Sequence, residues 1–206
     1  SMLPHNILSL VKSENGVKMT VDGNILDTIE SRSEHLSSYR TNAICIKYSD
    51  YVKNNQATNR DVFKHPLVYL YHDTIDAAGH GQNPIDIIDA CRRSIEQLSA
   101  LVKSLHATMN VVNVIVTSDH GFIYNDLKIE EKDKLQIQDA DIEKKTRYYL
   151  TTKHDWVEGI VKFPLDKVSA IQTEQPVFVG VPKGTNRIAT SGGYNFTHGG
   201  ASLQEM

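Results

Sequence analysis

The sequence predicts an α/β fold, because apolar runs of strand length alternate with segments of helical periodicity along its 206 residues. Two of the runs, Pro66–Tyr71 and Val111–Thr117, are rich in β-branched or aromatic residues, which is typical of strands buried on both faces. A long amphipathic segment separates them, and a strand, a crossover helix and a second strand form a right-handed unit with parallel strands. A chain of this length fits one compact domain, or at most two small lobes.

Turn, cap and apolar patterns place the individual elements. Near the start, Glu14–Gly16 and Asp22–Gly23 are turn signals on either side of Val17–Val21, which predicts a small hairpin or a strand with turns at both ends. A helix is expected to begin at Asn83–Pro84 and to run to about Leu105, with apolar residues at spacings of three and four. Strands are predicted at Thr41–Tyr48, Pro66–Tyr71, Val111–Thr117 and Pro176–Val181.

Residues 126–147 differ from the rest, because charges of both signs are dense and apolar residues are isolated. We expect a charged surface insertion here, formed as an amphipathic helix or as a loop beside the opening of the site. A solvated face without further role is favoured over a substrate lid.

The composition excludes some classes of protein. A net charge of -3 gives no electrostatic reason to expect direct nucleic-acid binding, since duplex-binding surfaces carry an excess of basic residues. Cys45 and Cys91 lie among apolar residues and are expected to be buried thiols, which fits a reducing, cytoplasmic location. No apolar run approaches the ~20 residues that a membrane span needs, so no membrane contact is expected.

Three short clusters that are far apart in sequence each contain a histidine: Asp76 with His80, Asp119 with His120, and His198 before two glycines. Their mixed oxygen and nitrogen ligands suit zinc or manganese better than magnesium or calcium. The first two clusters follow predicted strands, and open α/β sheets bind ligands at the carboxyl ends of parallel strands. Each cluster alone also fits an ordinary turn. Their joint occurrence predicts most of a two-metal site, of the kind that hydrolyses phosphate or sulfate esters.

The other histidines have no partner at ligand spacing, and a structural or surface role is expected for each. His72, together with Asp73, is the exception, because both residues lie beside Asp76 and could hydrogen-bond to a metal ligand without binding the metal.

The order Asp-x-x-x-His, then Asp-His-Gly, then His resembles the alkaline phosphatase superfamily. Within it, the phrases YHDTIDAAGH, VIVTSDHGF and FTHGGASLQEM are similar to the PglZ family, the phosphatase-like component of BREX phage-defence systems. The resemblance covers Leu67–Met206, and the last phrase is its most specific part. It implies an alkaline phosphatase-like fold with a mostly parallel central sheet and helices on both faces.

The resemblance also implies the ligand sets. Asp76, His80 and His198 would hold one metal ion, while Asp119 and His120 would hold the other. The stretch Met2–His5 looks like the one that follows the family's nucleophile. We therefore expect the serine or threonine nucleophile and a further aspartate ligand to lie upstream, with no catalytic nucleophile within residues 1–206. The chain would then be a partial domain, truncated at both ends.

These implications give the expected function. The parent protein would be a metal-dependent phosphatase or phosphodiesterase of a bacterial phage-defence system, with two zinc or manganese ions and a phosphate-ester substrate. This chain alone would bind one ion or none and would be inactive. Other BREX proteins, such as a methyltransferase, would be its partners. Two alternatives stay open: a non-catalytic scaffold that binds other defence proteins, and a general sulfatase or phosphodiesterase of the same superfamily.

Overall fold

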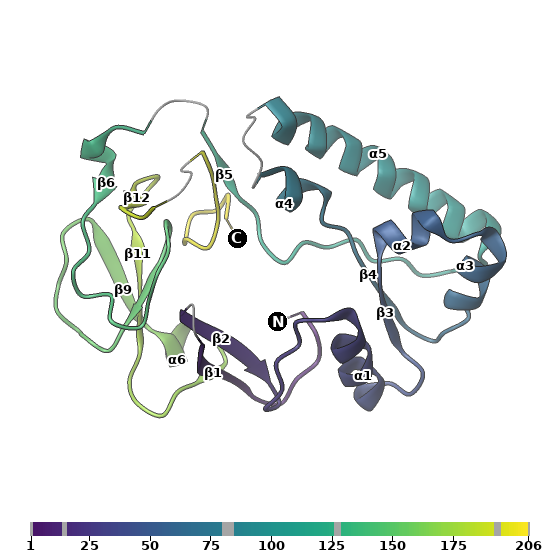
Figure 1. The fold of residues 1–206 in the computed structure, drawn as a ribbon, viewed down its shortest axis with the longest axis horizontal. Helices are drawn as coiled ribbons and strands as arrows, with labels where there is room; N and C mark the ends of the chain where they lie inside the picture. The colour runs from purple at the N-terminus through teal and green to yellow at the C-terminus, as the bar shows by residue number, and fades with distance from the viewer. Residues whose placement is uncertain (1, 14–15, 80–84, 126–128, 192–194, 206) are drawn as a thin grey trace. The chain divides into compact units, whose positions relative to one another are not determined.

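A computed structural model of the chain describes residues 2–13, 16–79, 85–125, 129–191 and 195–205 (Figure 1). The chain divides into two compact units. Unit 1 consists of residues 1–4 and 26–117, and unit 2 consists of residues 5–25 and 118–206. Each unit has its own apolar core.

Unit 1 is mainly helical. Its elements are α1 (Ile29–Tyr39), β3 (Ile44–Lys47), α2 (Tyr48–Lys53), α3 (Gln56–Val62), β4 (Val68–Tyr71), α4 (Thr74–Gly79) and α5 (Ile85–Thr108). Helix α1 begins at a capping box, in which the Thr28 hydroxyl accepts the Ser31 N–H at 3.1 Å and the Ser31 hydroxyl accepts the Thr28 N–H at 3.2 Å. Leu36 of α1 and Cys45 of β3 are buried in the core of this unit.

The predicted parallel strand pair of unit 1 is confirmed, with shorter strands than expected. β3 and β4 pair in parallel from Ile44 opposite Val68 to Lys47 opposite Tyr71. Figure 1 shows α1 and α5 on either side of this pair. The predicted long helix is confirmed as α5, while its expected start at Asn83–Pro84 lies outside the described residues. Helices α1, α2, α3 and α4 are not predicted by the sequence.

The strand predicted at Val111–Thr117 is wrong, and with it the strand–helix–strand unit that it would complete. α5 is followed by Asn110 in the left-handed region, at φ 59°, and the chain then runs without pairing to any strand in the described residues. Val112 and Ile115 are 78% and 89% exposed. A β-branched run indicates only that a segment can form a strand, because the strand itself needs a neighbouring backbone to bond with.

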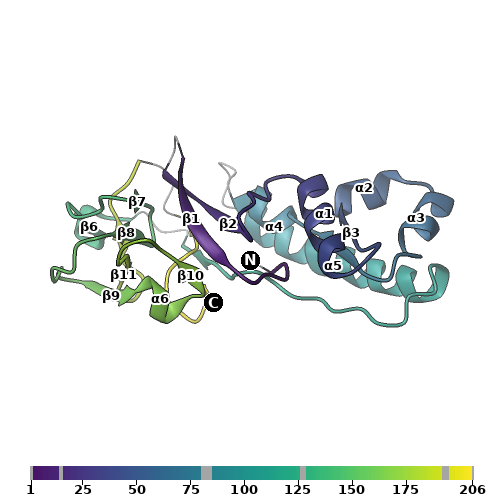
Figure 2. The same cartoon turned by 90° about the horizontal axis from the view of Figure 1, so that it is seen from below.

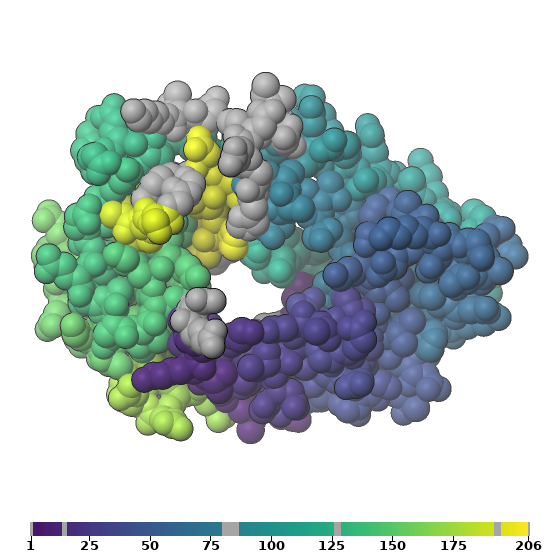
Figure 3. Space-filling model, in the orientation of Figure 1, coloured from purple at the N-terminus to yellow at the C-terminus, as the bar shows by residue number. Residues whose placement is uncertain are grey.

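Unit 2 is built from short strands. They are β1 (Leu8–Ser13), β2 (Gly16–Val21), β5 (Ile123–Tyr124), β6 (Lys134–Leu135), β7 (Glu143–Lys144), β8 (Tyr149–Thr151), β9 (Ile160–Pro164), β10 (Ile171–Gln172), β11 (Phe178–Pro182), β12 (Arg187–Ile188) and β13 (Phe196–Thr197), with a 3₁₀ turn η1 (Glu131–Asp133) and a short helix α6 (Leu165–Val168). The larger sheets have the strand orders β7-β8-β11-β9 and β10-β1-β2. Figures 2 and 3 show β1 and β2 beside the segment that contains α6 and β10.

The predicted hairpin near the start is confirmed as β1–β2, which pairs antiparallel from Leu8 opposite Val21 to Ser13 opposite Gly16. One of its two turn signals, Asp22–Gly23, has positive φ at both residues, 48° and 82°. The Asp22 carboxylate accepts the N–H groups of Asn6 and Ile7 at 2.9 and 2.7 Å, which ties the turn to the start of β1. The strand predicted at Pro176–Val181 is also found, as β11.

Residues 126–147, expected as a charged surface insertion, contribute to the core of unit 2 in the part that the structure describes. Ile137 packs with Tyr149, Ile160 and Ile188. Arg147 is 1% exposed and pairs with Glu205. The burial of these two residues could not be predicted from composition, because one isoleucine and one arginine do not change the average polarity of a densely charged segment.

The fold is therefore mixed α/β, as the sequence predicted, but it is assembled from small sheets. Parallel pairing in the described residues is limited to β3–β4, β1–β10 and β6–β12. A central parallel sheet with helices on both faces is not seen there. No helix in the described part of the chain combines the length and the apolar composition needed to cross a membrane.

Substitution of Gly180 by alanine is expected to destabilise unit 2 by about 2 kcal/mol. Gly180 of β11 lies opposite Tyr149 of β8, and a Cβ at position 180 would overlap the Tyr149 ring. Tyr149 is fully buried and cannot swing aside. Urea unfolding of the unsubstituted chain, Gly180→Ala, Tyr149→Leu and the double variant measures this change in the free energy of unfolding. Gly180→Ala should cost less in the Tyr149→Leu background, and an equal cost in both backgrounds would show that the ring is not the obstacle.

Candidate metal centre

A short antiparallel ladder in unit 2 brings two of the predicted histidines together. β5 pairs with β13, with Tyr124 opposite Phe196 and Ile123 opposite Thr197. Asn125 and Asn195 extend the ladder by two hydrogen bonds of 2.8 and 2.6 Å. His120 and His198 stand at its other end, although 78 residues separate them in sequence (198 − 120).

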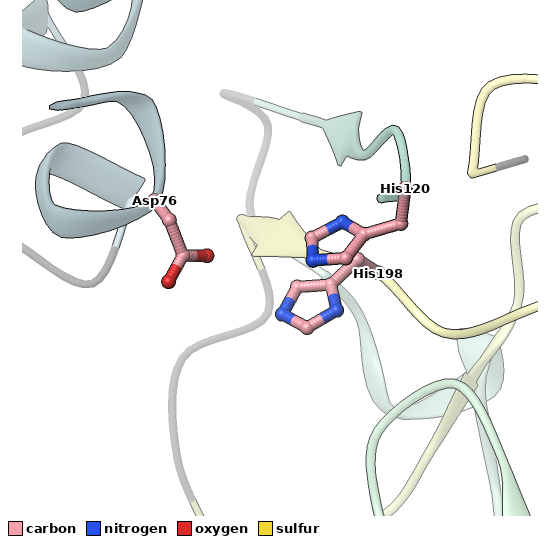
Figure 4. A group of neighbouring side chains, drawn as sticks. All are labelled: Asp76, His120 and His198. Carbon is pink, nitrogen blue, oxygen red and sulfur yellow. The ribbon is translucent and has the colours of Figure 1, made fainter. Parts of the chain in front are cut away.

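The side chains of His120 and His198 stack on one another (Figure 4). Their ring centroids are 4.2 Å apart and their planes differ by 9°. Phe196 and His198 form an edge-to-face pair with ring centroids 6.1 Å apart, and Phe122 packs on Phe196 with centroids 4.9 Å apart. Both imidazoles are half-buried, so they are supported by aromatic neighbours and still open to a ligand.

The turn around His120 determines which ring nitrogen is available. Nδ1 of His120 lies 2.9 Å from the carbonyl oxygen of Gly121. A carbonyl can only accept a hydrogen bond, so Nδ1 carries a proton, and Nε2 is the nitrogen that has the lone pair in the neutral imidazole. Metal-binding histidines are commonly oriented by a bond of this kind from the opposite nitrogen.

Asp119 lies next to that free nitrogen. Its Oδ2 is 3.9 Å from Nε2 of His120, and the carboxylate is 71% exposed. Two ligands that each lie ~2.0–2.2 Å from one zinc ion are no more than about 4 Å apart. The pair lies within this upper limit. The Ser118 hydroxyl, which donates to the His120 carbonyl at 2.5 Å, holds the backbone turn.

The remaining predicted site residues belong to unit 1. Asp76, also labelled in Figure 4, lies in the first turn of α4 and is exposed. His80 is outside the described residues. His72 follows β4, where its Nε2 lies 2.8 Å from Oε1 of Gln97 on α5, and Asp73 accepts the Ala77 N–H through its carbonyl at 2.9 Å. The sharing of one ion by Asp76, His80 and His198, and a supporting role for His72 and Asp73, stay predictions.

The structure adds two residues that the sequence analysis did not single out. The carboxylate of Glu205 receives two hydrogen bonds from Arg147, from Nε at 2.7 Å and from a terminal nitrogen at 2.8 Å, and both side chains are fully buried. Burial alone would raise the pKa of Glu205, but the bonds from Arg147 and Ser202 outweigh it and hold that pKa below its usual value. Glu205 lies within FTHGGASLQEM, the most specific of the three phrases, and this was the available signal.

Comparison with known proteins indicates one family. The model of the BREX system PglZ alkaline phosphatase-like domain matches residues 1–206. Among curated proteins, the chain is similar to the alkaline phosphatase-like protein PglZ of Bacillus cereus (strain H3081.97), at 34% identity over the whole chain and 24% of that protein. It is also similar to the alkaline phosphatase-like protein BrxZ of Escherichia coli O9:H4 (strain HS), at 29% identity over the whole chain and 24% of that protein.

No solved structure matches the chain. The chain spans about a quarter of the length of the two curated relatives, 24% in each case. The family match extends over every residue, including all three histidine clusters from which the resemblance was first inferred. This chain therefore belongs to the PglZ family, as a BREX-associated alkaline phosphatase-like protein.

Proposed function

We propose that the chain supplies most of the metal centre of a phosphatase or phosphodiesterase that acts in phage defence. Asp119 and His120 are the proposed ligands of one zinc or manganese ion, and Asp76, His80 and His198 those of the other. The family supports a metal-dependent hydrolase in general terms. The choice of ions follows from the mixed carboxylate and imidazole donors.

One observation carries the proposal. Nδ1 of His120 donates to the Gly121 carbonyl, so the lone pair of the neutral imidazole is on Nε2, and a carboxylate oxygen of Asp119 lies 3.9 Å from Nε2. The two atoms are therefore close enough to bind one ion. The stacked ring of His198 adds a second imidazole beside this point.

The ions, when bound, would clamp two oxygens of the ester and stabilise the charge that develops during an in-line displacement. The residues of this chain would hold and orient them. The Gly121 carbonyl keeps the His120 ring in its ligand orientation, and the stacking of His198 limits rotation of both rings. The serine or threonine nucleophile is proposed to come from a part of the protein outside residues 1–206.

The test is hydrolysis of an aryl phosphomonoester and an aryl phosphodiester by the full-length protein. We expect turnover that a chelator abolishes and that zinc or manganese restores. The 206-residue chain alone should be inactive with metal in excess, because removal of a covalent nucleophile costs several orders of magnitude in rate.

Three results would contradict the proposal. Turnover that persists after chelation would exclude a metal-dependent reaction. Cleavage of an aryl sulfate in preference to both phosphate esters would favour a sulfatase. A full-length protein that binds a partner such as a methyltransferase, but cleaves none of the three esters with either metal, would favour a scaffold.

A further inference from the structure

Glu205 contacts both chain segments that carry the stacked histidines. Its carboxylate accepts the N–H of Gly200, two residues after His198, at 3.2 Å, and the Ser202 hydroxyl at 2.7 Å. Its backbone carbonyl accepts the N–H of Gly121, the residue after His120, at 3.0 Å. Glu205 thus connects the loop that follows His198 with the turn that follows His120.

The two glycines fit tightly around this connection. A Cβ at Gly121 would overlap the carbonyl oxygen of Gln204, a backbone atom that cannot rotate away. A Cβ at Gly200 would lie 2.5 Å from a carboxylate oxygen of Glu205 and 2.9 Å from Arg147. A side chain at Gly121 would therefore collide with backbone, and one at Gly200 would displace the Arg147–Glu205 pair.

Arg147 anchors the other side of Glu205. Besides its two bonds to the carboxylate, its guanidinium donates to the carbonyl of Gly184 at 2.9 Å and to the carbonyl of Asn186. The arginine is therefore fixed by backbone groups of unit 2 that do not belong to the histidine segments. It holds Glu205 in one place relative to the rest of that unit.

A buried ion pair of this kind is a poor source of net stability, because the desolvation of both charges offsets most of their attraction. Its geometry is nevertheless exacting, since a planar guanidinium and a carboxylate meet along two parallel bonds. The pair is better suited to fixing a position than to stabilising the fold.

We propose that Arg147 and Glu205 are positioning residues for the metal centre, which hold the His120 turn and the His198 loop at the separation that metal binding requires. This inference rests on the proposed function for its metal. The placement of the two imidazoles, however, can be measured without any metal. In this proposal His120 and His198 bind metal, while Arg147 and Glu205 only hold those two residues in place.

The test compares Glu205→Gln with Asp139→Asn in the 206-residue chain. Asp139 is a matched control, because it forms another largely buried ion pair in unit 2, at 2.5 Å from Lys162, with side chains 15% and 9% exposed. Two measurements are made on each variant. Co²⁺ alone is titrated and its visible spectrum recorded, and the NMR cross-peak between the ring protons of His120 and His198 is measured without metal.

We expect Glu205→Gln to weaken Co²⁺ binding 10- to 100-fold, as substitution of groups behind metal ligands commonly does, and to weaken or abolish the ring cross-peak. Asp139→Asn should keep the parent's spectrum, its affinity within about 2-fold, and its cross-peak. Ser202→Ala, which removes only one bond to Glu205, should show a smaller change of the same kind. It provides the test if Glu205→Gln fails to fold.

The proposal is overturned if folded Glu205→Gln keeps both the cross-peak and the Co²⁺ affinity of the parent. It is also overturned if Asp139→Asn loses them equally, since the effect would then be a general loss of stability. If the parent chain binds no Co²⁺, the metal site of the proposed function fails. The cross-peak still decides whether Glu205 positions the two rings.

Discussion

Replacement of His198 or His120 by alanine in the full-length protein is expected to lower phosphate-ester hydrolysis on the order of 10²- to 10³-fold, the loss typical when one group that stabilises transition-state charge is removed. Each imidazole is a proposed metal ligand, and loss of either would leave its ion with too few donors. Asp119→Ala should have a similar effect, because its carboxylate lies 3.9 Å from Nε2 of His120. Steady-state kinetics with an aryl phosphodiester or monoester measures these losses.

His154→Ala is the control for this experiment. His154 is an exposed histidine of the same unit, and its ring contacts Phe178 edge-on at 4.8 Å. Its removal should leave the rate within about 2-fold of the parent, since it is not a proposed ligand. Undiminished hydrolysis after substitution of both His120 and Asp119 would show that these residues hold no essential ion. It would favour the alternative in which they belong to a non-catalytic scaffold.

The second large effect is expected in metal binding by the 206-residue chain. Zinc or manganese titrated at neutral pH should bind weakly. Each of the substitutions Asp76→Ala, His80→Ala and His198→Ala should abolish the tighter phase of the binding isotherm, so that the metal affinity falls at least about 10-fold. These three residues are the proposed ligands of one ion, and three ligands are sufficient for binding even without a nucleophile. Isothermal calorimetry measures the affinities.

His65→Ala serves as the control, because this exposed histidine lies in the same unit as Asp76 and is not a proposed ligand. It should bind metal like the parent. The assignment of the three ligands is wrong if the parent binds neither ion, or if all three ligand variants retain its affinity.

Local patterns determined several features of this protein. The spacing of apolar residues predicted α5, the short apolar runs predicted β3, β4 and β11, and the turn residues predicted the β1–β2 hairpin. Motif order was sufficient to indicate the family, which the match over residues 1–206 confirmed. These features could be predicted because helix periodicity, turn chemistry and short motifs are each expressed within a few neighbouring residues.

Other features were decided only by the tertiary structure. Val111–Thr117 has the composition of a buried strand and is largely exposed, because a strand depends on a partner backbone that its own residues do not encode. The stacking of His120 on His198 depends on the register of β5 with β13, and register is set between segments far apart in sequence.

The connection of Arg147 with Glu205 is the clearest example of this limit. The two residues are 58 positions apart, and one of them lies in a segment whose average composition predicts a solvated surface. A charged side chain is predicted to be exposed unless its partner of opposite charge is known. Only the folded chain brings Arg147 and Glu205 together in a buried, bidentate pair. The sequence by itself thus determined the family and the candidate ligands, while the tertiary structure decided what holds His120 and His198 in place, because that depends on long-range contacts.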